Sequence, residues 1–287
     1  MSVVIKLWGL IYMLVAFFGS ILVLLLHMIF GVPLGIAFVI MLVAAVPVSL
    51  VLLGKLRKAE IDKPDAKLHA EYMEELRKKG YTPRSFELAE QAFEWKRNGT
   101  KIDFVYLKDF VIYTADYYNM VEQSEKAFAC LDLLSKEDVE SKSIQFLDKG
   151  TTALLYYCVL MEACRGTHNP ARAQETFADV QPYLSKTYSI PSLTLSEELI
   201  CYHYYMLFED YDKAGQYVDE MMALNLPADI MSRHIARADY ALVKGDRETA
   251  REAMKQAKKC IPDGTPVLRE IYEFWMKRFS LTETDEE

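Results

Sequence analysis

The N-terminal part of the chain holds the feature that most restricts its fold, a run of 48 residues from Leu7 to Gly54 without Asp, Glu, Lys or Arg. The hydrocarbon core of a bilayer is about 30 Å thick and is crossed by about 20 helical residues. A single helix over the whole run would extend roughly 72 Å at a rise of about 1.5 Å per residue. Two crossings fit better, so the sequence predicts a two-helix membrane hairpin over residues 1–54, in the membrane through residues 7–53.

The residues that flank this run predict its orientation. Lys6 precedes the first crossing, three basic residues follow the second within positions 55–58, and Pro33 stands in a glycine-flanked turn between them. Because basic residues favour the cytoplasmic side, both termini and the rest of the chain are expected in the cytoplasm of a multi-pass cell-membrane protein with two spans. The turn is strongly apolar, so a hairpin that dips into the bilayer without crossing it remains an alternative.

The remainder of the chain is acidic. It contains all 41 acidic residues and 32 of the 33 basic ones, which gives this part a net charge of about −9. This balance argues against nucleic acid as a partner, because such binders need a basic face. The five cysteines form no C-x-x-C pair, and their odd number is not typical of a disulfide framework. A reducing compartment is therefore expected.

No motif for catalysis or for cofactor binding is present in the sequence. It lacks a phosphate-binding glycine loop, H-E-x-x-H and G-x-S-x-G. The histidines are scattered without metal-ligand spacing, and Cys201 and His203 would point to different faces of a helix. The sequence therefore predicts no catalytic residues, no cofactor and no metal. An enzyme built from residues far apart in the chain remains an alternative.

The charged part has helical periodicity throughout. Leu68, Tyr72 and Leu76 recur on one face of a helix, and a second helix opens with Thr82 and Pro83 as a cap and first position. No stretch alternates between apolar and polar residues as a strand would. The sequence thus predicts an all-α fold, with a juxtamembrane helical segment over residues 55–100.

Four later stretches share one pattern, a small residue preceded twelve positions earlier by a small, aromatic or methionine residue. Small residues let two helix axes approach closely, so each pair predicts a tightly packed helical hairpin. One such hairpin cannot bury its own apolar face, and stacking against neighbours is required. The pairs are Ala115 and Ala127, Met161 and Ala173, Tyr202 and Ala214, and Ala238 and Ala250.

This pattern resembles the tetratricopeptide repeat family. The best match is Met231 to Pro262, where Ala238, Gly245 and Ala250 stand at the family's characteristic places. The chain departs from the family in spacing, because its successive key alanines are 46, 41 and 36 residues apart, whereas the family repeat is 34 residues. The resemblance implies a right-handed solenoid of helical hairpins over residues 101–263. Residues 264–287 then form a capping helix and an acidic tail, with Ile271, Phe274 and Trp275 packing on the last hairpin.

In that family the first helix of each hairpin lines a concave groove that binds a peptide or a partner helix. The matching positions here include four acidic residues and one arginine, which implies a basic protein or peptide partner. The resemblance therefore implies a membrane-anchored adaptor or scaffold. Two alternatives stay open: the acids form a solvated face, or the chain is an accessory subunit whose hairpin makes the main contacts in a larger membrane complex. The candidate groove residues are Asp109, Asp116, Asn119, Glu162, Arg165, His203 and Asp239.

Overall fold

A computed structural model describes residues 62–141, 151–184, 191–226 and 229–281, together with positions 13, 15, 17, 19, 20, 23, 46–52 and 55. All regular elements among these residues are helices, so the described part of the chain is all-α, as predicted. The chain divides into two compact units, Met1–Lys67 and Leu68–Glu287. The unit boundary therefore falls within helix α3 (Pro64–Lys79), beyond residue 54, where the predicted membrane hairpin ends.

The first unit contains the predicted membrane hairpin, which lies largely outside the described residues. Within the described residues, no helix is both long enough and apolar enough to traverse a bilayer.

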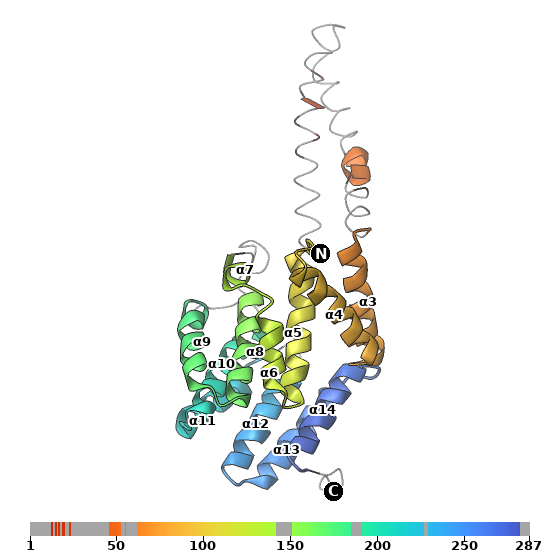
Figure 1. The fold of residues 1–287 in the computed structure, drawn as a ribbon. Helices are drawn as coiled ribbons and strands as arrows, with labels where there is room; N and C mark the ends of the chain where they lie inside the picture. Colours follow the sequence, from red (N-terminus) through yellow and green to blue (C-terminus); the bar gives the residue numbers. More distant parts are fainter. Residues whose placement is uncertain are drawn as a thin grey trace. The chain divides into compact units, whose positions relative to one another are not determined.

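The helices of the remaining chain are labelled in Figure 1 and follow one another without strands between them in the described residues. Their bounds are α3 (Pro64–Lys79), α4 (Pro83–Arg97), α5 (Phe104–Met120), α6 (Ser124–Leu131), α7 (Lys136–Ser141), α8 (Thr151–Gly166), α9 (Pro170–Leu184), α10 (Pro191–Leu207), α11 (Tyr211–Ala223), α12 (Met231–Val243), α13 (Arg247–Lys259) and α14 (Pro266–Arg278).

Four pairs of successive helices, α5–α6, α8–α9, α10–α11 and α12–α13, have the same three-residue connection. The N–H of its third residue donates to the carbonyl five residues earlier, as from Asp246 to Ala241 over 2.8 Å. The second residue of each connection has a left-handed backbone conformation, which ends the helix and lets the following N–H groups bond to its last carbonyls. One local geometry therefore produces all four hairpins. The left-handed residues are Glu122 (φ 58°), His168 (φ 50°), Glu209 (φ 57°) and Gly245 (φ 80°).

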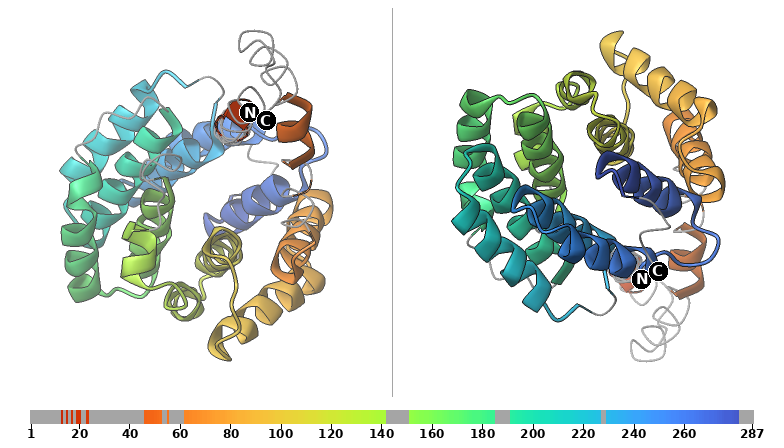
Figure 2. Two further views of the ribbon diagram at one scale, coloured as in Figure 1. Left: turned by 90° about the horizontal axis from the view of Figure 1, so that it is seen from above. Right: turned by 90° about the horizontal axis from the view of Figure 1, so that it is seen from below.

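The eight residues that predicted close helix packing are all fully buried, each at 0 % exposure. Successive pairs also pack on one another: α8 contacts α5 and α10, and α12 contacts α10 and α11. Helix α7 lies between the first two pairs, which accounts for their wider separation in the sequence. Figure 2 shows the pairs of the second unit following one another along an arc.

Within the second unit, the residues of the segment 55–100 pack against the helix pairs. Tyr72 of α3 and Leu88 of α4 are almost fully buried in one core with Phe110 of α5. The ring centroids of Tyr72 and Phe110 are 4.7 Å apart. Helices α3 and α4 therefore extend the core that contains α5, α6, α8 and α9.

Helix α14 was expected to cap the last pair, and it does more than that. Trp275 is buried against α12 and α13, but Phe274 contacts Tyr117 of α5 edge-on, with ring centroids 6.0 Å apart. Consecutive helical residues point about 100° apart, so these two cannot face the same neighbour. Glu270 also accepts the backbone N–H of Tyr81, over 2.8 Å. Figure 2 accordingly shows α14 on the inner side of the arc.

Candidate functional site

A cavity of about 440 Å³ lies between the hairpin pairs and α14; we call it the central cavity. Four of the predicted groove residues line it, one from each first helix of the four pairs: Asp116, Glu162, His203 and Asp239. The remaining wall is largely apolar and includes side chains of α14, so the concave side is partly filled by the chain itself. The apolar lining includes Met120, Leu199, Ile235, Leu268, Ile271 and Trp275.

A second cavity of about 290 Å³ shares Glu162, His203 and Trp275 with the central cavity. Two further predicted groove residues, Asn119 and Arg165, line this second cavity. Six of the seven predicted residues therefore gather around two adjoining cavities.

The carboxyl groups of Asp116 and Glu162 have neither a hydrogen bond nor an ion pair with any described residue. Burial raises the pKa of Asp116 to about 6. Burial and then the nearby Asp116 raise the pKa of Glu162 to about 8, although Arg278 and Arg165 oppose the shift. Glu162 therefore keeps its proton at neutral pH, whereas Asp116 keeps its proton only up to about pH 6, still well above an ordinary carboxyl.

His203 also contributes a polar group to the cavity wall and is only 8 % exposed. Its Nδ1 has no hydrogen-bond partner among the described residues. Burial, followed by the positive charge of Arg165, lowers its pKa to about 3. The imidazole is therefore neutral at physiological pH and can donate one hydrogen bond and accept another.

Arg165 and Asp239, both predicted to bind a partner, bind each other across α8 and α12. The guanidinium Nη1 lies 2.5 Å from Oδ2 of Asp239, and the Tyr202 hydroxyl donates to the same oxygen over 2.8 Å. Burial would raise the pKa of Asp239, but these two contacts outweigh it and lower the pKa. The pair is internally neutralised and holds three helices together.

Asp109 lies away from both cavities. Its Oδ2 is 2.8 Å from Nε2 of His69 in α3. The sequence places Asp109 two turns before Asp116 on the same face of α5, but α3 covers that end of the helix. Asn119, in turn, donates to the carbonyl of Val159 over 2.9 Å and is 2 % exposed. Packing thus withdraws the Asp109 carboxylate from both cavities, whereas Asn119 uses only its amide nitrogen within the fold and its Oδ1 has no hydrogen-bond partner among the described residues.

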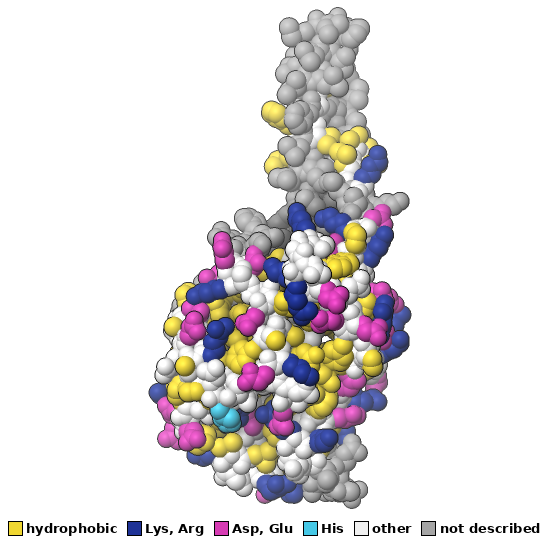
Figure 3. Space-filling view, viewed as in Figure 1, with side chains coloured by type: hydrophobic (Ala, Val, Ile, Leu, Met, Phe, Trp, Pro, Cys, Tyr) yellow, Lys and Arg dark blue, Asp and Glu magenta, His cyan; other side chains and the backbone are white. Residues whose placement is uncertain are grey.

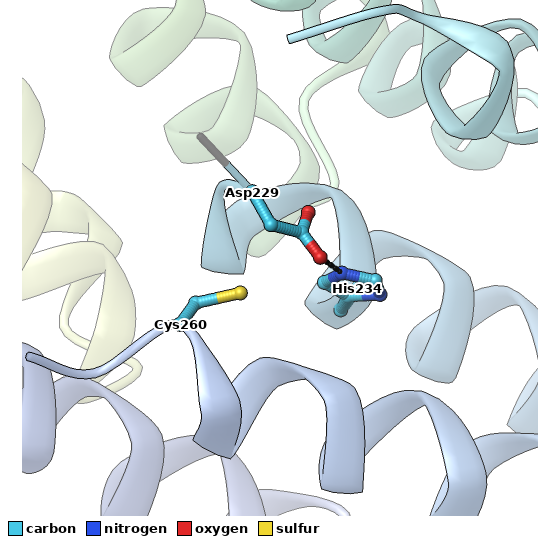
Figure 4. Close-up of side chains that lie close together, drawn as sticks. All are labelled: Asp229, His234 and Cys260. Carbon is cyan, nitrogen blue, oxygen red and sulfur yellow. Dashed lines mark hydrogen bonds and ion pairs between the residues drawn. The ribbon is translucent and has the colours of Figure 1, made fainter. Parts of the chain in front are cut away.

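A cluster of three side chains with metal-ligand chemistry lies at the edge of the central cavity and was not predicted from the sequence. Asp229, His234 and Cys260 place ligand-type atoms within 4.8 Å of one another (Figure 4), and Asp229 and Cys260 line the cavity. Oδ2 of Asp229 is 2.7 Å from Nε2 of His234. Asp229 precedes α12, His234 lies in the first turn of α12, and Cys260 follows α13. Only the hairpin brings them together, so no spacing motif could have predicted the cluster.

The outer face seen in Figure 3 has a different character from the cavity. Acidic and basic side chains are interspersed there without a large field of one sign. Exposed acids elsewhere on the helical unit are neutralised locally, as Glu71 is by Arg84 at 2.6 Å.

The arrangement is chemically suited to holding a compact, partly apolar cation, and the cluster at its edge offers oxygen, nitrogen and sulfur to a metal ion.

No known family model matches the sequence, and no match was found among curated proteins or among solved structures.

Proposed function

We propose that this protein is a membrane-anchored helical interaction module whose central cavity receives a basic group from a partner protein. The observation that carries the proposal is the pair of carboxyls on α5 and α8, Asp116 and Glu162, which line the cavity without a partner among the described residues. A buried charge without a counter-charge is costly, so burial favours the protonated form of both carboxyls, and a cation that enters the cavity would favour their ionised form.

The apolar wall favours a particular kind of cation. Ile235, Ile271 and Trp275 offer contacts to a hydrocarbon stem, while the carboxyls receive its charged end. Lysine and arginine side chains have this division between an apolar stem and a charged head. Because α14 lines the concave side, the partner is expected to insert one basic side chain and not to lay an extended peptide along the full arc.

Anchoring through residues 7–53 would restrict the module to a membrane surface. Tethering raises the effective concentration of a partner on the same membrane, so a contact through one or two side chains would suffice. The tetratricopeptide-like pairing of helices supports this function, since stacked helical hairpins offer extended binding surfaces. The proposed location is the cell membrane, with the helical unit in the cytoplasm.

A second candidate function is acid–base catalysis in the same cavity. A carboxyl with a pKa of about 8 beside one with a pKa of about 6 suits proton transfer near neutral pH. The substrate would again be a compact molecule with a positive or polar end. In this case the cavity would turn over a small molecule, and no partner protein would depend on the two carboxyls.

The test compares crosslinking and capture from native membranes for the full chain and for a variant carrying Asp116→Asn and Glu162→Gln. A matched control carries Asp212→Asn and Glu125→Gln, which remove the same charges from exposed positions. We expect one partner that the parent and control capture and the cavity variant loses. The captured partner's segment, with its basic residue changed to glutamine, should also fail to bind. Equal capture by all three proteins would exclude the cavity as the binding site.

A further inference from the structure

The open end of the α12–α13 hairpin brings together three residues with metal-ligand chemistry. Asp229 and His234 come from the start of α12 and Cys260 from the end of α13, because antiparallel helices place the start of one beside the end of the other. Carboxylate oxygen, imidazole nitrogen and thiolate sulfur are the three ligand types that zinc accepts in proteins. We propose that Asp229, His234 and Cys260 form a zinc site that joins the two helix ends at the edge of the central cavity.

The distances between the side chains are close to those that a zinc ion requires. The three ligand-type atoms lie within 4.8 Å of one another, and Asp229 and His234 already approach to 2.7 Å. Bonds of about 2.0–2.3 Å in tetrahedral geometry separate ligands by about 3.4–3.6 Å. Closing the site therefore needs a movement of about 1 Å, and in Figure 4 the sulfur and the imidazole lie on opposite sides of the Asp229 carboxylate.

The surroundings of Asp229 orient it for this role. Arg233 binds Oδ1 through Nε at 2.6 Å and Nη2 at 2.5 Å, which leaves Oδ2 directed toward His234. A second group that fixes a ligating carboxylate is a usual part of metal sites. The guanidinium also ties Asp229 to the main chain before α12, since its Nη1 donates to the carbonyl of Leu224 over 3.1 Å.

The charges of the site nearly cancel, and its protons can be accounted for. Zinc and Arg233 bring three positive charges, and the carboxylate with the thiolate supplies two negative ones. His234 is 3 % exposed, and ligation through the Nε2 lone pair requires the tautomer with the proton on Nδ1, an atom without a hydrogen-bond partner among the described residues. Cys260 releases its proton to solvent as its thiolate binds, so binding should strengthen as pH rises.

Three protein ligands leave one tetrahedral position unfilled. Asp229 and Cys260 line the central cavity, so this position would be accessible from it. Zinc sites with three protein ligands keep the fourth position for water or another small ligand. The site would thus add a group able to bind anions or thiols to a cavity whose other wall carries carboxyls.

The test uses the full chain, reduced and stripped of metal, with zinc followed by calorimetry and cobalt by absorption. We expect one ion per chain and a cobalt–thiolate charge-transfer band. Cys260→Ser should abolish the band, and His234→Gln should weaken zinc binding by at least about 100-fold. The matched control is Cys158→Ser, a second cysteine of the cavity wall outside the cluster, which should keep the band.

Circular dichroism of each variant without metal establishes that it is folded before its binding is compared. Absence of the band in the parent would overturn the proposal. So would its survival in Cys260→Ser, or its loss in the folded Cys158→Ser control, since the metal would then use other ligands.

Discussion

The carboxyls of the central cavity acquire their properties from burial and not from residue type. Asp116 and Glu162 are ordinary acids in the sequence, and two of the many on the helical unit. Burial removes water from around both carboxyls and raises both pKa values. The nearby Asp116 raises the pKa of Glu162 further. Asp239 experiences comparable burial, but Arg165 reverses its effect. The presence of one basic partner thus decides whether a buried acid holds helices together or remains available to bind a ligand.

A pH dependence of stability follows from Glu162. Its pKa rises from 4.5 to about 8 on folding, so the folded chain holds this proton more tightly than the unfolded chain. Stability therefore falls as pH increases from 4.5 through 8. We expect Glu162→Gln to raise the midpoint of thermal unfolding at pH 8 and to change it little near pH 4.5. The exposed control Glu125→Gln should show no such trend. A difference between Glu162→Gln and the parent that does not change with pH would contradict the assignment.

Loss of Asp239 should destabilise the protein through the group that it leaves behind. Asp239→Ala removes the counter-charge of Arg165 and the acceptor of Tyr202, both in the interior of the helical unit. We expect a cost of about 2–3 kcal/mol in the free energy of unfolding, measured by urea denaturation. Combining Arg165→Met with Asp239→Leu should cost less than Asp239→Ala alone. A larger cost for the double variant would mean that the ion pair itself stabilises the fold.

At the level of elements, the turns that close the helix pairs carry the repetition of the structure. The four pairs differ in sequence and in spacing, yet each has a left-handed residue at the same place. Only Gly245 is a glycine, so the other three connections hold a residue in a conformation that it adopts at a cost.

These turns predict opposite effects of two substitutions. Gly245→Ala should destabilise by about 1 kcal/mol, since φ is 80° and nothing lies within 4 Å of the added methyl group. Glu209→Gly should stabilise by about 0.5–1 kcal/mol, because φ is 57° and the side chain is exposed. Glu209→Ala keeps the strained backbone and should be nearly neutral. Equal effects of Glu209→Ala and Glu209→Gly in thermal unfolding would show that the backbone conformation is not the cause.

At the scale of the whole molecule, two compact units divide the chain near residue 67. The second unit has its own buried cores, which include α3 from Leu68 onward. A fragment beginning at Ile61 is therefore expected to be strongly helical by circular dichroism and to unfold cooperatively in urea. Weak helicity or a gradual transition would mean that the helical unit depends on the N-terminal segment.

Exchange of the N-terminal segment distinguishes an interaction module that its hairpin only anchors from an accessory subunit that associates through the hairpin. We expect a chain in which an unrelated two-span anchor of the same orientation replaces residues 7–53 to keep its capture of the partner, because the proposed contact lies in the helical unit. Capture at parental level would support the interaction module. Loss of capture, with the exchanged chain present in the membrane, would favour an accessory subunit that associates through its hairpin.

The sequence by itself determined the helices and their pairing. Periodicity, caps and turn residues act between neighbours in the chain, and the residues that predicted close approach, such as Ala127 and Ala250, are fully buried. The charge-free N-terminal run is equally plain in the sequence, and its place in a membrane stays a prediction. These features could be predicted because each depends on interactions within one hairpin or on composition alone.

Only the tertiary structure decided which groups meet across hairpins. The path of α14 along the inner side turns an expected open groove into a cavity. The pairing of Arg165 with Asp239, 74 residues apart, joins two different hairpins, and the approach of Cys260 to Asp229 depends on how α12 and α13 pack within one. Such contacts arise from the angles at which whole helices pack, to which many small apolar contacts contribute. No local pattern encodes those angles, so the sequence named most of the cavity's acids but not which of them would remain unpaired.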